Sequence, residues 1–365
     1  MEGLNHHVLE DIGMFFNKVN DRALYTMGIN DSYDDGGNKA LGETVEYFHP
    51  QITLDDRMRY IAENIVYNEN IDDINKVCNT IISHFYGARG IHQTMTRNPD
   101  PKTALVDFHR LLTDEDYVEE LNKNLDDAHN YGIPIYGSTE LRTSLYGAAN
   151  NFVAEKYNKP KDARLINIAL WVAGFIERGI IKKFYEVNSL EELFNHLTTI
   201  EGVGSYYGYH CSTSNSVNPK ININHDERFC VPGPGARYTL DLLFDKSCDM
   251  DYGERVVWFR ENYKNYIGEI PLHHTTHNIS VDGRKVFTDE QDELKTYGCE
   301  VGLCQYGVYT RLRDNPHLID RRKVARLDMK AMEDFFAGKN PPNYIPKLGE
   351  SGYQVSMFDI IDELI

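Results

Sequence analysis

Apolar residues recur every three to four positions along most of the chain, which is the spacing of one face of an α-helix. This pattern predicts helices over residues 8–19, 53–67, 71–86, 103–112, 141–157 and 165–184. Ser189 and Glu192 form a capping box, which predicts the start of another helix that ends at Ile200. Alternation typical of a strand is confined to residues 279–286. A mainly α fold is therefore predicted.

The helical pattern is interrupted by an acidic, glycine-containing stretch at residues 31–50, which we interpret as a loop. The chain contains no internal repeat and no linker rich in proline and serine. We therefore expect one all-α unit that contains two adjoining lobes rather than separated domains. The predicted division is an N-terminal helical lobe at 1–160, a second lobe at 161–345, and a C-terminal tail at 346–365.

Charge and composition limit the classes of function. The formal net charge of -18 argues against a protein that coats nucleic acid, because DNA binding needs Lys and Arg against phosphates. Residues 310–330 nevertheless hold seven bases against three acids, so local docking of DNA is allowed. No apolar run is long enough to span a membrane. We expect a cytoplasmic protein without a membrane partner.

The metal-binding residue types do not form a familiar site. The six cysteines include no C-x-x-C pair, so we interpret them as reduced thiols. His273, His274 and His277 lie close together in sequence, but no carboxylate completes a zinc ligand set there. We therefore predict neither a bound metal nor a cofactor.

The most informative segment begins where the helix ending at Ile200 meets Gly202-Val203-Gly204. Two glycines around a small apolar residue allow a sharp turn, and a new helix is expected after Ser205. Consecutive backbone N–H groups at such a turn can bind a DNA phosphate. The segment resembles the helix–hairpin–helix of base-excision DNA glycosylases. Tyr206 follows directly and could stack on nucleic acid.

Residues after the hairpin supply candidate chemistry. Asp226 lies about 22 residues beyond Gly204, the distance at which the glycosylase superfamily places an aspartate in its base-binding cleft. The run from Pro232 to Arg237 contains two prolines and two glycines, and we expect a stiff loop that presents Gly233, Gly235 and Arg237 to phosphate or base.

The hairpin, this proline–glycine run and the stretch from Cys299 to Leu312 together resemble the alpha-glutamyl/putrescinyl thymine pyrophosphorylase group, over roughly residues 190–312. Its members include phage amino-acid:DNA transferases, and its fold is similar to that of helix–hairpin–helix glycosylases. The resemblance implies an enzyme that replaces the phosphate or pyrophosphate on phosphorylated 5-hydroxymethyluracil in double-stranded DNA with an amino acid or another amine. The chain has no G-x-x-x-x-G-K-S/T loop, so we do not expect it to be the kinase that installs the phosphate.

This chemistry suggests roles for the candidate residues. Arg237 and the glycine run suit the departing phosphate, because that group needs positive charge and N–H donors. The amine nucleophile must lose a proton, for which Asp226, His225 and His210 are candidate bases. Glu300 is a candidate for binding the incoming amino group. Arg311 and Arg313 are further candidates for contact with DNA.

Two other functions remain open at this stage. A DNA glycosylase acting on a modified pyrimidine would use the same hairpin and aspartate. A non-enzymatic, acidic helical protein could bind a basic partner. Separately, Gln354 to Phe358 resembles the pentapeptide that binds bacterial sliding clamps, although this segment could also dock on the protein's own core.

Overall fold

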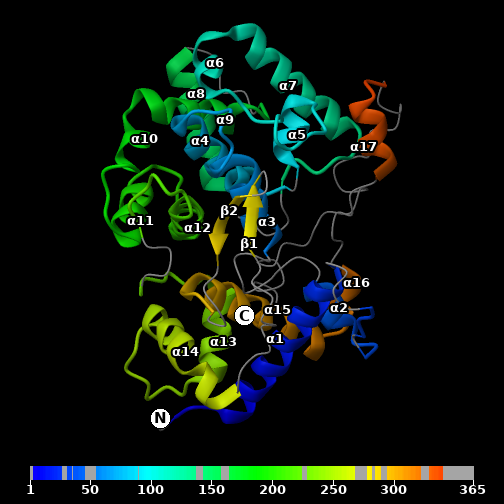
Figure 1. Ribbon diagram of the computed structural model, residues 1–365, viewed down its shortest axis with the longest axis vertical. Helices are drawn as coiled ribbons and strands as arrows, with labels where there is room; N and C mark the ends of the chain where they lie inside the picture. Colours follow the sequence, from blue (N-terminus) through cyan, green and yellow to red (C-terminus); the bar gives the residue numbers. More distant parts are fainter. Residues whose placement is uncertain are drawn as a thin grey trace. The chain divides into compact units, whose positions relative to one another are not determined.

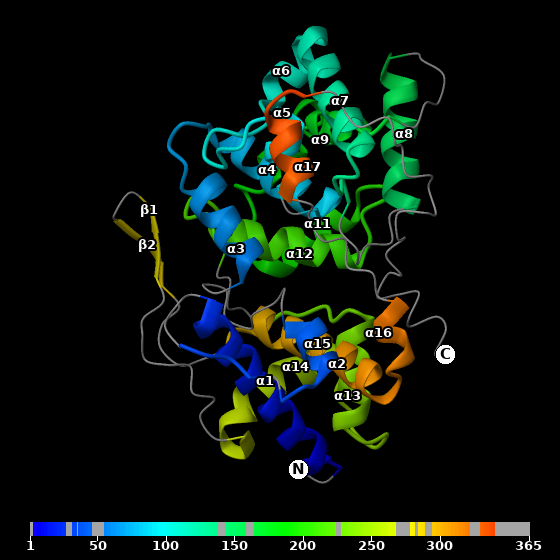
Figure 2. The same ribbon diagram turned by 90° about the vertical axis from the view of Figure 1, so that its right-hand side faces the viewer.

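The computed structural model describes residues 3–26, 31–34, 36–45, 55–88, 90–136, 143–157, 164–223, 228–267, 278–281, 284–288, 294–321 and 329–339. These residues are mainly helical, as predicted (Figures 1 and 2). Several sequence candidates lie outside the described residues: His225, Asp226, the histidines at 273–277, and the tail at 354–358.

Contacts between Cα atoms divide the chain into two compact units whose segments alternate along the sequence. Unit 1 comprises Met1–Ala62 and Asn224–Asp320, and unit 2 comprises Glu63–Ile223 and Arg321–Ile365. The boundary suggested by the sequence at residue 160 falls inside unit 2, where the helices on either side of it pack against each other.

Unit 1 is organised around one long helix, α15. Its elements are α1 (His6–Thr26), α2 (Lys39–Val45), α3 (Asp56–Tyr60), the π-helix η1 (Ile61–Val66), which crosses into unit 2, α13 (Pro234–Leu243), α14 (Tyr252–Ile267), β1 (Asn278–Val281), β2 (Arg284–Thr288), α15 (Thr296–Asp314) and α16 (His317–Arg321). Helices α1, α2, α13 and α14 all pack on α15 (Figure 2). The strands form an antiparallel pair with a register shift between Ile279 and Ser280.

Aromatic side chains and one ion-pair network fix α1 against α15. Phe15 and Phe16 of α1 are buried, and the Phe15 ring stacks on that of Tyr309 with 5.2 Å between centroids. Asp11 of α1 accepts a hydrogen bond of 2.7 Å from the Tyr306 hydroxyl and one of 2.6 Å from Arg313. Burial of these aromatic rings therefore stabilises the packing of α1 on α15, and the Asp11 carboxylate fixes how the two helices are aligned.

The prediction of a loop over residues 31–50 is wrong in part, because α2 occupies Lys39–Val45. The Asn38 carboxamide accepts a hydrogen bond from the Leu41 N–H at 3.1 Å, in the manner of an N-cap, and Asn38 also donates to the Tyr309 hydroxyl at 3.2 Å. Ala40 and Leu41 are buried. Packing on α15, which is distant in sequence, thus stabilises this helix, which is too short for its apolar residues to show a helical repeat.

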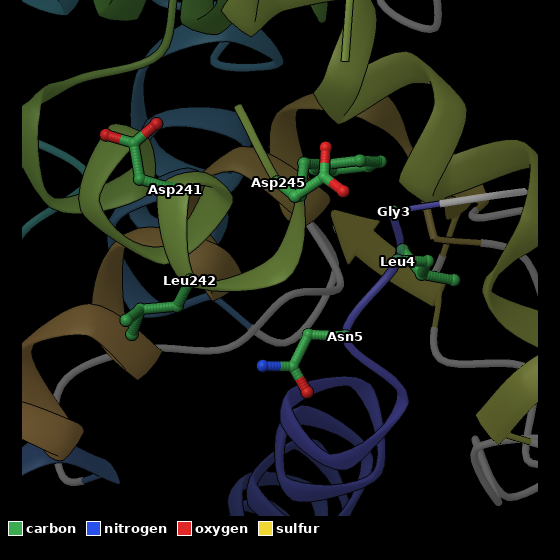
Figure 3. Close-up of a pocket in the computed structure, with 7 residues that line it drawn as sticks. Gly3, Leu4, Asn5, Asp241, Leu242 and Asp245 are labelled. Atoms are coloured by element: carbon green, nitrogen blue, oxygen red, sulfur yellow. The ribbon is translucent and has the colours of Figure 1, made fainter. Parts of the chain in front are cut away.

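One open pocket of unit 1 lies where residues 3–5 meet the end of α13 (Figure 3). Asp241 and Asp245 line it, but both carboxylates already accept hydrogen bonds, from the Tyr252 hydroxyl and from Ser247 respectively. The two carboxylates in this pocket therefore stabilise the local structure, and we assign them no catalytic role.

Unit 2 is built around the buried helix α4. Its elements are α4 (Asp73–Tyr86), α5 (Ile91–Thr96), α6 (Phe108–Thr113), α7 (Glu115–Asn130), α8 (Thr143–Tyr157), α9 (Asn167–Glu177), α10 (Ile180–Lys183), α11 (Leu190–Thr198), α12 (Ser205–Ser216) and α17 (Met329–Phe336). Helix α4 packs on α9 and α12. Gly179, with φ +71°, separates α9 from α10, so the helix predicted over 165–184 is broken there.

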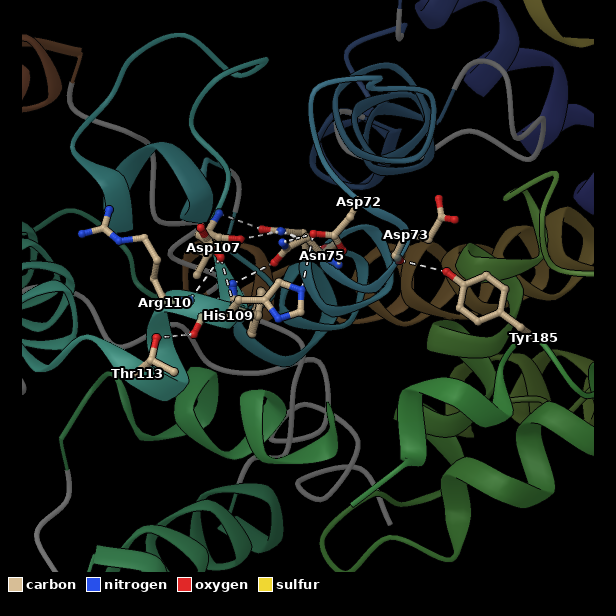
Figure 4. Close-up of polar contacts among 11 residues, drawn as sticks. Asp72, Asp73, Asn75, Asp107, His109, Arg110, Thr113 and Tyr185 are labelled. Atoms are coloured by element: carbon tan, nitrogen blue, oxygen red, sulfur yellow. Dashed lines mark hydrogen bonds and ion pairs between the residues drawn. The ribbon is translucent and has the colours of Figure 1, made fainter. Parts of the chain in front are cut away.

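Aspartates and asparagines connect the helix ends of unit 2 (Figure 4). Asp72 caps α4 and Asp107 caps α6, each by accepting a backbone N–H. The His109 ring lies 3.4 Å from the Asp72 carboxylate, and the Tyr185 hydroxyl donates to the Asp73 carbonyl at 2.8 Å. Asp72 and Asp107 are therefore structural caps of these helices.

Candidate functional site

The turn predicted around Gly202–Gly204 lies between two helices of unit 2. Helix α11 ends at Thr198 and α12 begins at Ser205, and the two helices pack together. Gly202 adopts φ +86°, a conformation that favours glycine. Val203 is buried and anchors the turn, while Gly204 and Ser205 are exposed. Gly204 is the N-cap of α12 without a side-chain cap, so the first N–H groups of this helix are available to an anion.

Aromatic side chains follow the hairpin on α12. Tyr206 and His210 are half-buried, and their ring centroids are 4.4 Å apart. Tyr207 and Tyr209 are only 4% and 1% exposed, so these two tyrosines belong to the core. Only the first pair is therefore placed where a base could stack.

A histidine that the sequence analysis missed lies next to His210. His84 of α4 is buried, its ring lies 6.0 Å from that of His210, and its Nε2 is 2.7 Å from Ser214 Oγ. His84 stands on an apolar helix face, where a histidine is usually a satisfied core residue, so only its contact with α12 distinguishes it. The half-exposed His210 therefore lies beside a buried histidine that is itself within hydrogen-bonding distance of the Ser214 hydroxyl.

The proline–glycine run is not a loop throughout, which corrects the prediction. Gly233 is the N-cap of α13, Pro234 occupies the first helical position, and Gly235 to Arg237 form the first turn. Proline suits that position because its missing N–H would have no partner there and its φ is already helical. The positive end of the α13 dipole therefore lies at this run.

Glu300 of α15 lies behind the start of α13. Its Oε1 accepts a hydrogen bond of 2.9 Å from the Gly233 N–H, and the residue is only 3% exposed. Burial raises the pKa of Glu300 to about 7, although the Gly233 hydrogen bond acts in the opposite direction. A Cβ on Gly233 would lie 3.6 Å from Oε1, which is an ordinary van der Waals contact. Glu300 is thus a carboxyl that can exchange a proton near neutral pH.

Cys304, one turn beyond Glu300, completes the contact with α13. Its sulfur accepts hydrogen bonds from the Gly235 and Ala236 N–H groups. Burial and the nearby Glu300 nevertheless raise the pKa of this thiol well above its usual range. No sequence pattern indicates a role for this cysteine beyond its spacing of four from Glu300.

The three candidate arginines of unit 1 differ in their surroundings. Arg237 is exposed, and its Nε donates to the Pro232 carbonyl at 3.0 Å. Arg311 is 8% exposed, with its guanidinium 4.0 Å from the centroid of the Tyr238 ring. Arg313 forms ion pairs with Asp11 and Asp314 at 2.6 and 3.0 Å. Contact of Arg311 and Arg313 with DNA stays a prediction.

The candidate residues fall in both units. The Gly202–Ser205 turn, Tyr206 and His210 belong to unit 2, whereas Arg237 and Glu300 belong to unit 1. Within the described part of the chain, no group of three or more His, Cys, Asp or Glu side chains could hold a metal ion. No helix among the described residues is long and apolar enough to cross a membrane.

The hairpin gives a matched pair of glycine variants that separate DNA binding from folding. A Cβ on Gly204 would meet nothing within 4 Å, whereas one on Gly202 would lie 2.6 Å from Ala148 Cβ and would require a strained φ. We expect Gly204→Val to fold normally and to weaken DNA binding equally for all sequences, because phosphate contacts carry no sequence information. Gly202→Val should lower stability as well.

Fluorescence anisotropy with two unrelated duplexes, together with thermal unfolding, checks this prediction. If Gly204→Val binds both duplexes as tightly as the wild-type protein, the hairpin is only a connection between helices.

Comparison with known proteins identifies the family. The family model described as "5-hmdU DNA kinase, helical domain" matches residues 52–317, well over half of the chain. No curated protein and no solved structure matches the chain. The match agrees with the expected connection to 5-hydroxymethyluracil in DNA, while the pyrophosphorylase group is a finer assignment that it does not make. The chain, helical in the part described and without a G-x-x-x-x-G-K-S/T loop, belongs to the 5-hmdU DNA kinase helical-domain family.

Proposed function

We propose that this chain binds double-stranded DNA containing phosphorylated 5-hydroxymethyluracil and replaces the phosphate on the methylene carbon with an amine. The observation that carries the proposal is Glu300, a buried carboxyl at the start of α13 with a pKa of about 7. The family match supports the base and the polymer. The missing G-x-x-x-x-G-K-S/T loop favours a step other than phosphorylation.

The proposed reaction is a substitution at the methylene carbon. The amine nitrogen supplies the electron pair for the new C–N bond, and the phosphate oxygen leaves with the pair of the broken C–O bond. An amino acid is an ammonium ion at neutral pH, so a group must accept its proton. A base with a pKa near the operating pH does this most effectively, and Glu300 meets that condition.

Positive potential for the departing phosphate would come from α13. The N-terminal end of this helix carries partial positive charge, and Arg237 lies exposed in its first turn. The Gly202–Ser205 turn of unit 2 would bind backbone phosphate. Asp226 and His225 remain proposed bases from the sequence, as alternatives to Glu300.

A second candidate is phosphorylation of the hydroxymethyl group, which the family description favours. The same carboxyl could then accept the proton of the hydroxyl group as its oxygen attacks the phosphoryl donor. This function would require a donor site that the chain's sequence does not mark with the usual phosphate-binding loop.

Mass spectrometry of nucleosides separates these functions. The full chain is incubated with three duplexes, which contain thymine, 5-hydroxymethyluracil or its phosphate ester, in the presence of ATP and a mixture of amino acids. We expect an amine adduct on the phosphorylated duplex alone. A phosphate ester formed from the hydroxymethyl duplex would show the kinase, and release of a free base would show a glycosylase. An unchanged phosphorylated duplex contradicts the proposal.

A further inference from the structure

Among the residues that the structure describes, Arg311 is a buried cation that pairs with no carboxylate. Arg311 is 8% exposed, and its Nη1 atom is buried without a hydrogen-bond partner. No carboxylate of the described residues forms an ion pair with it, whereas Arg313, two positions along α15, pairs with both Asp11 and Asp314. Buried arginines are normally paired, because desolvation of an uncompensated charge is costly. This is unexpected in a protein whose net charge is -18.

Arg311 lies on the face of α15 that packs against the start of α13. Glu300, Cys304, Gly307 and Arg311 recur at intervals of four, three and four, which places them on one face of the helix. Gly307 contacts Gly235, and the Arg311 guanidinium covers the Tyr238 ring at 4.0 Å. Long side chains on a helix point back toward its N-terminus, so the guanidinium extends toward the preceding turn.

Two independent sources of positive potential meet at this place. The first is the dipole at the N-terminal end of α13, a ten-residue helix whose N-cap N–H, on Gly233, donates to Glu300 Oε1. The second is Arg311, whose charge acts on the Cys304 thiol, the same thiol that accepts the Gly235 and Ala236 N–H groups. The Cys304 thiol itself stays neutral there, because burial and the nearby Glu300 raise its pKa.

We propose that Arg311, Tyr238 and the first turn of α13 form a binding site for a phosphate-type anion. A guanidinium can bind two oxygens of a phosphate along one edge while its face stays against an aromatic ring. Tyr238, which is half-buried, would cover the site from solvent. The identity of the anion as the leaving phosphate or pyrophosphate rests on the proposed function, whereas the site itself does not.

Thermal unfolding and calorimetric titration of the full chain with inorganic phosphate and pyrophosphate test the site, with sodium chloride matched in ionic strength. The wild-type protein should show saturable binding and a melting temperature that rises by several degrees at high anion concentration, since a ligand stabilises the state that binds it. Arg311→Met should lose both effects. It should also melt no lower than the wild-type protein without anion, because an unpaired buried charge has been replaced by an apolar side chain of similar length.

Arg313→Met is the matched control on the same helix, and it should keep the anion-dependent rise although it loses the ion pair with Asp11. The absence of saturable binding in the wild-type protein overturns the site, and so does an equal response in Arg311→Met. Pyrophosphate binding without amine transfer would support the site and contradict the proposed function. Transfer without anion binding would contradict the site alone.

Discussion

Glu300→Gln should unfold less readily than the wild-type protein above pH 7 and should lose base-modification activity. Burial raises the pKa of Glu300 from its ordinary value of 4.5 to about 7. Between these two values the folded chain binds a proton that the unfolded chain does not, so stability falls as the pH rises through this window. Above pH 7 the buried carboxylate is charged, and its desolvation lowers the free energy of unfolding by an amount on the order of 3 kcal/mol.

Glutamine removes this cost and keeps the contact with α13. Its carboxamide oxygen can still accept the Gly233 N–H, which Oε1 of Glu300 accepts at 2.9 Å. The variant should therefore match the wild-type protein near pH 4.5 and exceed it in stability at pH 8. Activity should be lost at every pH, because an amide cannot accept the proton of the amine.

Urea unfolding at several pH values and the nucleoside assay measure the two effects, and Glu333→Gln, at an exposed position, is the control. A variant that retains activity removes Glu300 from the mechanism. A wild-type stability that does not fall between pH 5 and pH 8 relative to the variant would mean that the carboxyl is not buried in the charged form.

Local signals predicted much of the helical structure. Ser189 is the N-cap of α11, and its hydroxyl accepts the Glu192 N–H at 3.0 Å, as the capping box predicted. The reciprocal bond differs, because Glu192 accepts the N–H of Asn188 rather than that of Ser189. The turn at Gly202–Gly204 was equally readable, since it depends on the conformational freedom of glycine at one position.

The errors arise where contacts distant in sequence decide the structure. Proline discouraged a helix at residues 232–237, yet Pro234 begins α13 because its position at the first turn lacks an intrahelical partner anyway. Helix α2 depends on its packing against α15. Each compact unit combines segments from two separate parts of the chain, and local sequence patterns carry no information about such pairing.

The candidate site shows the same limit. Glu300, Arg237 and His210 were recognised by residue type and motif, but the sequence alone does not predict how deeply each side chain is buried. The pKa of Glu300 depends on its desolvation by neighbouring helices. His84 was missed because its contact with Ser214 joins two helices that lie 130 residues apart in the chain. Chemistry of this kind follows from packing rather than from local pattern.

Gly307→Ala should destabilise unit 1 strongly, although it adds only one methyl group. Helices α13 and α15 approach each other through Gly235 and Gly307. A Cβ on Gly307 would lie 2.6 Å from the Gly235 carbonyl oxygen and 2.9 Å from Thr239 Oγ1. Backbone cannot move aside as a flexible side chain can, so the helices must separate. Overpacking of this kind costs about 1–3 kcal/mol and occasionally more.

The expected loss opposes the intrinsic preference of helices, which favours alanine over glycine by about 1 kcal/mol. Gly147→Ala supplies the control, because Gly147 lies within α8 and a Cβ there would meet nothing within 4 Å. That variant should be slightly more stable than the wild-type protein. Because the start of α13 carries the contact with Glu300, separation of the helices should also lower activity in Gly307→Ala. Urea unfolding of both variants measures the difference, and a Gly307→Ala protein as stable as Gly147→Ala would show that α13 and α15 do not pack through these glycines.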